Sequence, residues 1–356
     1  MASQLFRVPE LVGEILSYLD MRALMCISTT TRSIYREAIR QLVRNTSPSK
    51  PCHLRLLVGW LTRAPCISVS IKNLNIWWKA DETPCRAHLM ILASHLPRAS
   101  GLSSLFGDSS TEALLGELSL LDVSNWRHLS QLTLRGVSPN DSRTLALVHC
   151  LPSKLRSFAI SFREEESDGW RWLNGHQESL LRVSILGARL PEPAPGVFTR
   201  TVDLTVSLQH ASECLISAFP NLTQLHGKHD GTRTRVYSAV KLQRWTHLRH
   251  LRGEWNISSV RSYSLPNLWL DGRLATNFMG VLRMAQQLYP GSLSLFGSID
   301  QISEIDNDNF PRWPRLFEAV SVTAYWKKSD LNMNDFVNDA AVVVVSSTTT
   351  AITGSY

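Results

Sequence analysis

The stretch LSQLTLRG, residues 129–136, has leucine at its first, fourth and sixth positions and ends in glycine. Successive side chains of an extended strand alternate between its two faces, so residues separated by one position share a face. Leu132 and Leu134 are therefore expected to face a core, with Thr133 and Arg135 on the opposite face. The stretch predicts one short strand with a single buried face.

The same apolar spacing recurs along most of the chain, at intervals of about 25 residues. Further copies, some of them looser, begin at Ile71, Leu102, Leu155, Leu180, Val202, Leu222, Leu248, Leu265, Leu293 and Phe317. Short amphipathic helices are predicted between strands at 112–121, 143–150 and 279–288. Repeats of this kind stack their strands into one continuous sheet. We therefore predict an α/β fold in which residues 53–338 form an irregular leucine-rich-repeat solenoid with a parallel concave sheet.

Helical spacing replaces strand spacing in residues 5–43, LFRVPELVGEILSYLDMRALMCISTTTRSIYREAIRQLV. Pro9 suits the first position of a helix because its φ angle is fixed and it lacks an N–H group. Asp20 and the threonines at 29–31 can each cap a further helix. We predict a three-helix module over residues 1–44 and a polar linker over residues 45–52.

Part of this module resembles the F-box, which docks substrate receptors onto the Skp adaptor of cullin-type ubiquitin ligases. The resemblance lies in Val8-Pro9-Glu10, in Glu14 to Asp20 (EILSYLD), and in Leu24 and Ile27. The irregular repeats that follow are similar to the divergent leucine-rich regions after F-boxes in many fungal proteins. The resemblance implies that the Skp adaptor and the cullin ligase core are partners. It also implies adaptor contacts from Pro9, Leu11, Ile15, Leu16, Leu19, Leu24 and Ile27.

A target-binding surface is expected on the concave face, where residues between the core positions project. Trp269 lies between two predicted core leucines, and tryptophan is enriched at interface hot spots. Cationic neighbours would suit an acidic or phosphorylated peptide. Alternatively, Trp269 packs against an adjacent loop. The candidate target-binding residues are Arg135, His226, Lys228, His250, Arg252, Trp269 and Phe296.

The sequence lacks the common motifs of catalytic sites. It has no G-x-x-x-x-G-K-[ST] phosphate loop, no H-E-x-x-H pair and no G-x-S-x-G nucleophile elbow. The histidine pairs 226/229 and 247/250 have no carboxylate or cysteine cluster to complete a set of metal ligands. We expect no enzyme activity, no cofactor and no metal site.

Composition bounds the remaining possibilities. The 356 residues carry a formal charge of +7, but the basic residues are dispersed, so no nucleic-acid partner is expected. Neither a signal peptide nor a membrane span is evident, which favours a cytoplasmic or nuclear protein. The six cysteines form no C-x-x-C pair and are expected to be reduced and mostly buried.

The sequence therefore predicts the substrate-recognition subunit of a cullin-type ubiquitin ligase, with an unknown target protein. A leucine-rich-repeat interaction scaffold with a helical N-terminal cap is the alternative. Nucleic-acid binding driven by net charge is a weaker third possibility. Residues 339–356, which include Val342 to Val345, form either an edge strand or a loose tail.

Overall fold

The chain is a mixed α/β protein that divides into two compact units, Met1–Leu180 (unit 1) and Leu181–Tyr356 (unit 2). This division falls inside the single repeat domain predicted over residues 53–338. The computed structural model describes residues 9–77, 85–108, 112–151, 154–163, 167–207, 214–228, 247–252, 265–273, 290–298, 319–325 and 342–345.

Unit 1 begins with the three predicted helices, α2 (Pro9–Ser17), α3 (Met21–Ile27) and α4 (Arg32–Arg44). Both predicted caps are present. Asp20 Oδ1 accepts a hydrogen bond from Ala23 N at 2.7 Å, and Thr31 Oγ1 accepts one from Ile34 N at 3.3 Å. Helix α4 contacts both α2 and α3, and its Ala38 is fully buried. Helix α4 is therefore the centre of this module.

The segment predicted as a linker is instead part of the folded unit. Strand β1 (Asn45–Thr46) pairs in parallel with β2 (Asn73–Ile76), and helix α5 (Pro51–Arg63) begins directly afterwards. Asn45 Oδ1 accepts a hydrogen bond from Asn73 Nδ2 at 2.6 Å. The polar residues that suggested a linker thus bond to a strand far along the chain, which local composition does not reveal.

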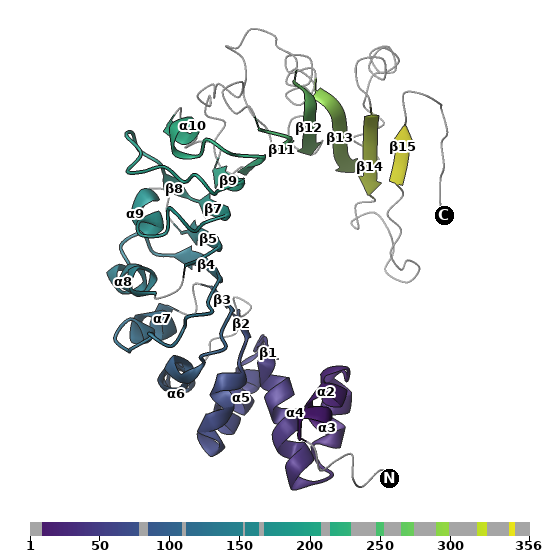
Figure 1. Cartoon of the computed structure of the whole chain (residues 1–356), viewed down its shortest axis with the longest axis vertical. Helices are drawn as coiled ribbons and strands as arrows, with labels where there is room; N and C mark the ends of the chain where they lie inside the picture. The colour runs from purple at the N-terminus through teal and green to yellow at the C-terminus, as the bar shows by residue number, and fades with distance from the viewer. Residues whose placement is uncertain are drawn as a thin grey trace. The chain divides into compact units, whose positions relative to one another are not determined.

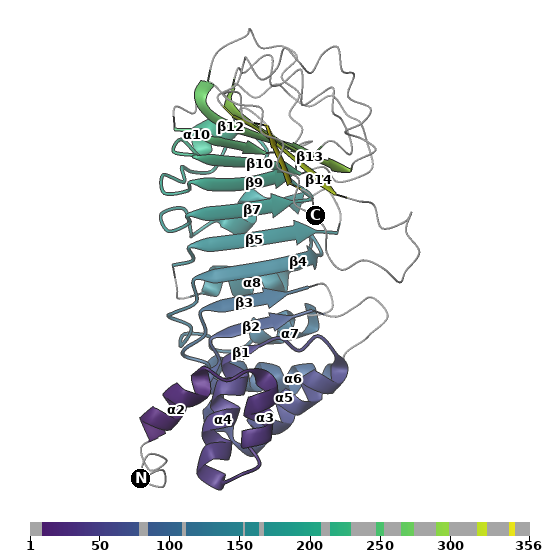
Figure 2. The ribbon, with the colours of Figure 1, turned by 90° about the vertical axis from the view of Figure 1, so that its right-hand side faces the viewer.

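Strands β1 to β5 of unit 1 pair in parallel and in chain order (Figure 2). The last three of them are β3 (Ser104–Gly107), β4 (Gln131–Val137) and β5 (Ser157–Phe162). The helices that follow strands lie along one side of this sheet (Figure 1). They are α6 (Arg86–His95), α7 (Glu112–Leu118), α8 (Ser142–Cys150) and α9 (Trp170–Leu173). Two 3₁₀ helices, η1 (Pro65–Ser70) and η2 (Leu96–Arg98), follow α5 and α6 in the chain. The prediction of a parallel sheet is confirmed.

Six of the described strands repeat one pattern of backbone hydrogen bonds at their start, in which a single carbonyl accepts two N–H groups from the next strand. The carbonyl of Ser103 accepts from Ser130 N at 2.9 Å and from Gln131 N at 3.1 Å. The same pair of bonds recurs at the carbonyls of Lys72, Ser130, Leu181, Val202 and Thr223. Successive strands therefore begin with the same backbone geometry.

The apolar positions of the repeated motif form the core. In β4, Leu132 and Leu134 are buried, while Gln131 and Arg135 are exposed, as the alternation predicts. Trp126, five residues before β4 in the chain, is fully buried. Its indole Nε1 donates a hydrogen bond to the carbonyl of Leu96 at 2.9 Å. The buried indole N–H of Trp126 is thus paired with a backbone carbonyl of the preceding repeat.

A buried histidine also joins two repeats. His176 is 6% exposed, and its Nε2 lies 3.2 Å from the carbonyl oxygen of Val148. Because a carbonyl can only accept, Nε2 carries the proton that is donated. Burial lowers the pKa of His176 below its usual value, since the charged form loses hydration there.

Unit 2 continues with parallel strands that again pair in chain order. They are β7 (Arg182–Leu186), β9 (Asp203–Ser207), β10 (Gln224–Lys228), β11 (His250–Arg252), β12 (Leu265–Arg273), β13 (Pro290–Ser298) and β14 (Ala319–Tyr325). Shorter elements are α10 (Cys214–Ala218), β6 (Ser167–Asp168, in unit 1) and β8 (Ala188–Arg189). The helix predicted at 279–288 lies outside the described residues.

The C-terminal valines form an edge strand. Strand β15 (Val342–Val345) pairs antiparallel with β14, so these four residues adopt the first of the two predicted alternatives. The other residues of the segment 339–356 lie outside the described part of the chain.

Two further expectations concern the cysteines and the membrane. All six cysteines are free, but five of them are exposed and Cys214 alone is buried, so the prediction of mostly buried thiols is wrong. Cys26 and Cys52, for example, lie on helix positions outside the buried side.

Among the described helices, none is long and apolar enough to cross a membrane.

Candidate partner-binding surfaces

Helix α2 carries apolar side chains on two sides. Val12 and Leu16 are 5% and 2% exposed, and α2 contacts α4. Leu11, Ile15 and Tyr18 are 42%, 48% and 81% exposed, and their i, i+4, i+7 spacing places them along one line of the helix and its last turn. One apolar side thus stabilises the module, while the other faces solvent.

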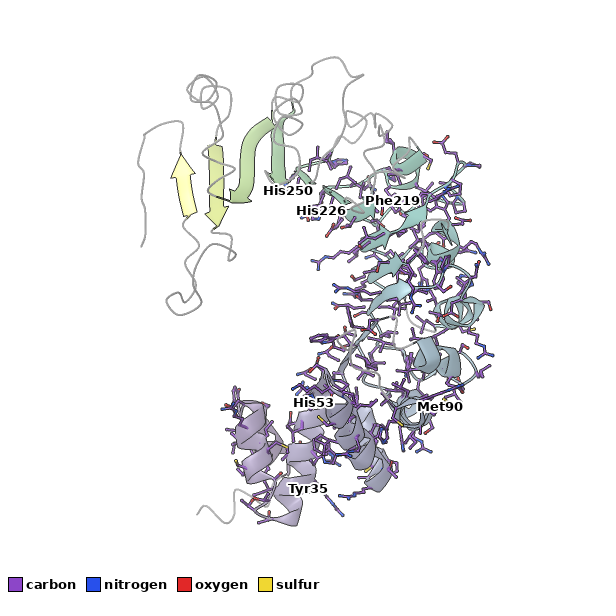
Figure 3. The ribbon with its side chains drawn as sticks, turned by 180° about the vertical axis from the view of Figure 1, so that it is seen from behind. Tyr35, His53, Met90, Phe219, His226 and His250 are labelled. Atoms are coloured by element: carbon purple, nitrogen blue, oxygen red, sulfur yellow. The ribbon has the colours of Figure 1, made fainter. Side chains whose placement is uncertain are left out.

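The two neighbouring helices add further exposed apolar side chains. Met25 of α3 is 42% exposed, and Tyr35 of α4, labelled in Figure 3, is 39% exposed. The described residues hold 13 exposed large apolar side chains, and five of these lie in the first three helices or in the turn after α2. We call Leu11, Ile15, Tyr18, Met25 and Tyr35 the exposed apolar set. Such a concentration is typical of a surface that binds another protein.

The predicted adaptor-binding residues separate into two groups. Leu11 and Ile15 are exposed, Leu19 and Ile27 are half-buried, and Pro9 is the first residue of α2. Leu16 and Leu24, in contrast, are 2% and 6% exposed and are already part of the module's own core. Their expected role as direct contacts is corrected, because they have almost no surface left for a partner to bury.

Three members of the exposed apolar set were absent from the predicted contacts: Tyr18, Met25 and Tyr35. The sequence did hold a signal for Tyr18, since it continues the i, i+4, i+7 line of Leu11 and Ile15. Met25 and Tyr35 could not be assigned in this way, because their exposure depends on which side of α3 and α4 the helices bury.

The predicted target-binding residue of unit 1, Arg135, is exposed and rests on an aromatic ring. Its Cζ lies 5.0 Å from the centroid of the Phe106 ring, which is the geometry of a cation–π contact. Trp77 follows β2 and is 40% exposed. Neither aromatic residue was among the predicted contacts, although Trp77 lies one residue after the buried Ile76 and so could be assigned to the opposite face.

The remaining predicted target-binding residues lie on the strands of unit 2. The register places His226 opposite Arg252, His250 opposite Trp269, and Arg273 opposite Phe296. Figure 3 shows His226 and His250 on the neighbouring strands β10 and β11. Lys228 ends β10 and pairs with Ser207. The side chains of Lys228, Arg252, Trp269 and Phe296 lie outside the described part of the structure.

These surfaces offer apolar and cationic groups suited to binding. Within the described residues, no group of three or more His, Cys, Asp or Glu side chains could hold a metal ion. A comparison with protein-family models finds no match for this chain. A search of curated proteins also finds none with significant sequence similarity.

Proposed function

We propose that this chain is the substrate-recognition subunit of a cullin-type ubiquitin ligase. In this proposal helices α2 to α4 dock the Skp adaptor, and the strand-lined surface holds a target protein for ubiquitin transfer. The observation that carries the proposal is the exposed apolar set on the N-terminal helices. A folded module that leaves Leu11, Ile15 and Tyr18 in water along one line has an apolar side available to a partner.

Two features of the chain support this proposal. The residues that resemble the F-box, Pro9 and Glu14 to Asp20, coincide with helix α2 and with the cap of α3. The parallel strands pair in chain order, and six of the described strands begin with the same pair of backbone hydrogen bonds, which is the arrangement expected of a leucine-rich-repeat solenoid. We therefore infer an F-box followed by irregular leucine-rich repeats.

The proposed adaptor contacts are the side chains that remain available. Leu11, Ile15 and Tyr18 would form the centre of the interface, with Met25 and Tyr35 from the neighbouring helices. Leu16 and Leu24 would act indirectly, by holding α2 and α3 against α4. Because truncating either of them would disturb the module itself, variants at these positions do not test docking.

The proposed target surface of unit 2 lies across strands β10 to β13. The register pairs His250 with Trp269 and His226 with Arg252, which places an arginine, two histidines and a tryptophan on neighbouring strands. An acidic or phosphorylated peptide would suit such positions. The adaptor and the target would then bind different parts of the chain, and ubiquitin transfer itself would be carried out by other subunits.

The alternative scaffold also has an observation in its favour. Helix α4 continues directly into β1, which forms the first strand of the unit 1 sheet, and Val43 at the end of α4 is fully buried. The N-terminal helices therefore protect the end of the sheet, as a solenoid cap must. A cap, however, does not require an exposed apolar line on its outer side.

The experiment is a pull-down of purified Skp adaptor by the full-length chain. The full chain is preferable to residues 1–50, because cutting there would separate β1 from its partner strand β2. Binding of the adaptor in a stoichiometric complex is expected. No binding by a chain with a normal unfolding transition would refute the ubiquitin-ligase proposal and leave the capped scaffold.

A further inference from the structure

A second candidate surface lies on unit 1, on the face of β2 to β5 opposite their buried leucines and isoleucines. On β2 and β3, Asn75 pairs with Phe106, and Phe106 in turn pairs with Thr133 of β4. Trp77 and Arg135 each lie two residues further along their strands. We call Trp77, Phe106, Thr133 and Arg135 the unit 1 strand surface.

The Arg135 guanidinium is held in place by its neighbour. It lies over the Phe106 ring, with 5.0 Å between Cζ and the ring centroid, and the side chain of Arg135 is exposed. An arginine stacked in this way keeps the N–H groups at the edge of its plane available to an acceptor. Planar carboxylates match that edge with two parallel hydrogen bonds.

A second arginine side chain, that of Arg163, is hydrogen-bonded to the backbone beside Arg135. The sheet has an irregular register between Leu134 and Val137, and Gly136 takes a positive φ of 62°, which favours glycine. This conformation lets the Gly136 carbonyl accept from Arg163 Nε at 2.7 Å, while its N–H donates to Ser161 Oγ at 3.2 Å. The Arg163 side chain is thereby anchored at the residue that follows Arg135.

Charge on these strands favours an anionic occupant. Of the described residues on this face, Arg135 and Arg163 are basic and Asp108, which follows β3, is acidic. Glu164 to Glu166 follow Arg163 in the sequence and lie outside the described residues. Two guanidinium groups thus outnumber one carboxylate among the described charges of this face.

The aromatic part of the surface lies at a defined distance from the charge. Trp77 and Arg135 are on strands separated by β3, so their backbones are about 10 Å apart. A segment in the polyproline II conformation advances about 9 Å over three residues, and its three residues per turn bring side chains three positions apart to the same side. The 40% exposed indole of Trp77 can therefore meet an apolar side chain while Arg135 meets a residue three positions away.

We propose that the unit 1 strand surface binds a segment of a target protein in the polyproline II conformation that carries an apolar side chain and, three residues from it, an aspartate or glutamate. The proposal rests on the proposed function only in taking the occupant to be a ligase target. It places a recognition site on β2 to β4, in addition to the strands of unit 2.

The test uses the immobilised full-length chain and three libraries of short peptides. Each library holds leucine or phenylalanine and, three residues from it on either side, aspartate, asparagine or phosphoserine, with all other positions mixed. The aspartate library should be retained about tenfold or more over the asparagine library, which is the effect of one charge-assisted bidentate contact. Equal retention of these two libraries would overturn the proposal, and a preference for phosphoserine over aspartate would overturn the carboxylate assignment.

Variants then locate the binding. Arg135→Ala should abolish the preference for aspartate, and Arg135→Lys should keep only part of it, because lysine lacks the planar fork. Trp77→Ser should lower the retention of every library while the preference for aspartate remains. Arg127→Ala removes another exposed arginine, from the turn before β4, and should change nothing. An unchanged preference in Arg135→Ala would refute the site.

The adaptor pull-down separates this inference from the proposed function. Arg135→Ala and Trp77→Ser should bind the Skp adaptor as the wild type does, since both residues lie outside helices α2 to α4. If the wild type does not bind the adaptor but prefers the aspartate library, the ubiquitin-ligase proposal is refuted and the peptide-binding surface is retained. If the wild type binds the adaptor but shows no aspartate preference, the peptide-binding surface is refuted and the ubiquitin-ligase proposal is retained.

Discussion

Replacing Ile15 with aspartate should abolish adaptor docking while the chain stays folded. Ile15 is 48% exposed, so a partner that covers it completes the burial of about half of an isoleucine side chain. That remaining burial stabilises a complex by about 1 kcal/mol. A carboxylate in its place would lose its hydration without a partner, which adds at least about 2 kcal/mol. The sum corresponds to a loss of affinity of about 100-fold or more.

The assay is titration of purified Skp adaptor into the full-length chain by calorimetry. Ile15→Ala should weaken binding by about fivefold, because only the apolar contribution is lost. Leu56→Asp is the matched control, since Leu56 is 50% exposed on α5, outside the exposed apolar set. Thermal unfolding of all three variants should match that of the wild type. Wild-type affinity in Ile15→Asp, or an equal loss in Leu56→Asp, would refute the assignment of this side of α2.

Three other predictions concern stability. Leu16→Ala should lower the free energy of unfolding of the N-terminal helices by about 2–4 kcal/mol, since Leu16 is 2% exposed, and hydrogen exchange in α2 should rise. Asp141→Ala should cost about 1–2 kcal/mol in urea unfolding, because the Asp141 carboxylate caps α8 by accepting from Arg143 N at 3.1 Å and Thr144 N at 3.0 Å; an unchanged midpoint would contradict this. The pKa of His176 is lowered by burial, so the unfolded state binds more protons and stability should fall as the pH drops below about 6.5. His176→Gln should reduce that slope in melting experiments between pH 8 and pH 5, and an identical slope would exclude His176 as its source.

Much of the fold followed from local pattern. The apolar spacing that marks Leu132 and Leu134 places their strand correctly, and the same spacing locates the other parallel strands from β2 to β14. The caps at Asp20 and Thr31 were also predictable, because a cap bonds to an N–H group only three residues away. The linker prediction failed where the partner is distant, since Asn45 pairs with Asn73.

The candidate sites were predicted less completely. Helical spacing identified α2 as apolar, but it could not tell that Leu16 is buried while Ile15 is half-exposed. That difference arises because α4 covers one side of α2. Likewise, Arg135 was expected to face outward, but its contact with Phe106 requires two strands to be aligned in register.

The sequence by itself determined the N-terminal helices, most of the strands and which side of those strands is apolar, because those properties depend on neighbours within a few positions. The tertiary structure alone decided which apolar side chains remain in water and which charged and aromatic residues meet. Those outcomes depend on contacts between segments about 25 residues or more apart, and local spacing carries no record of how such segments align.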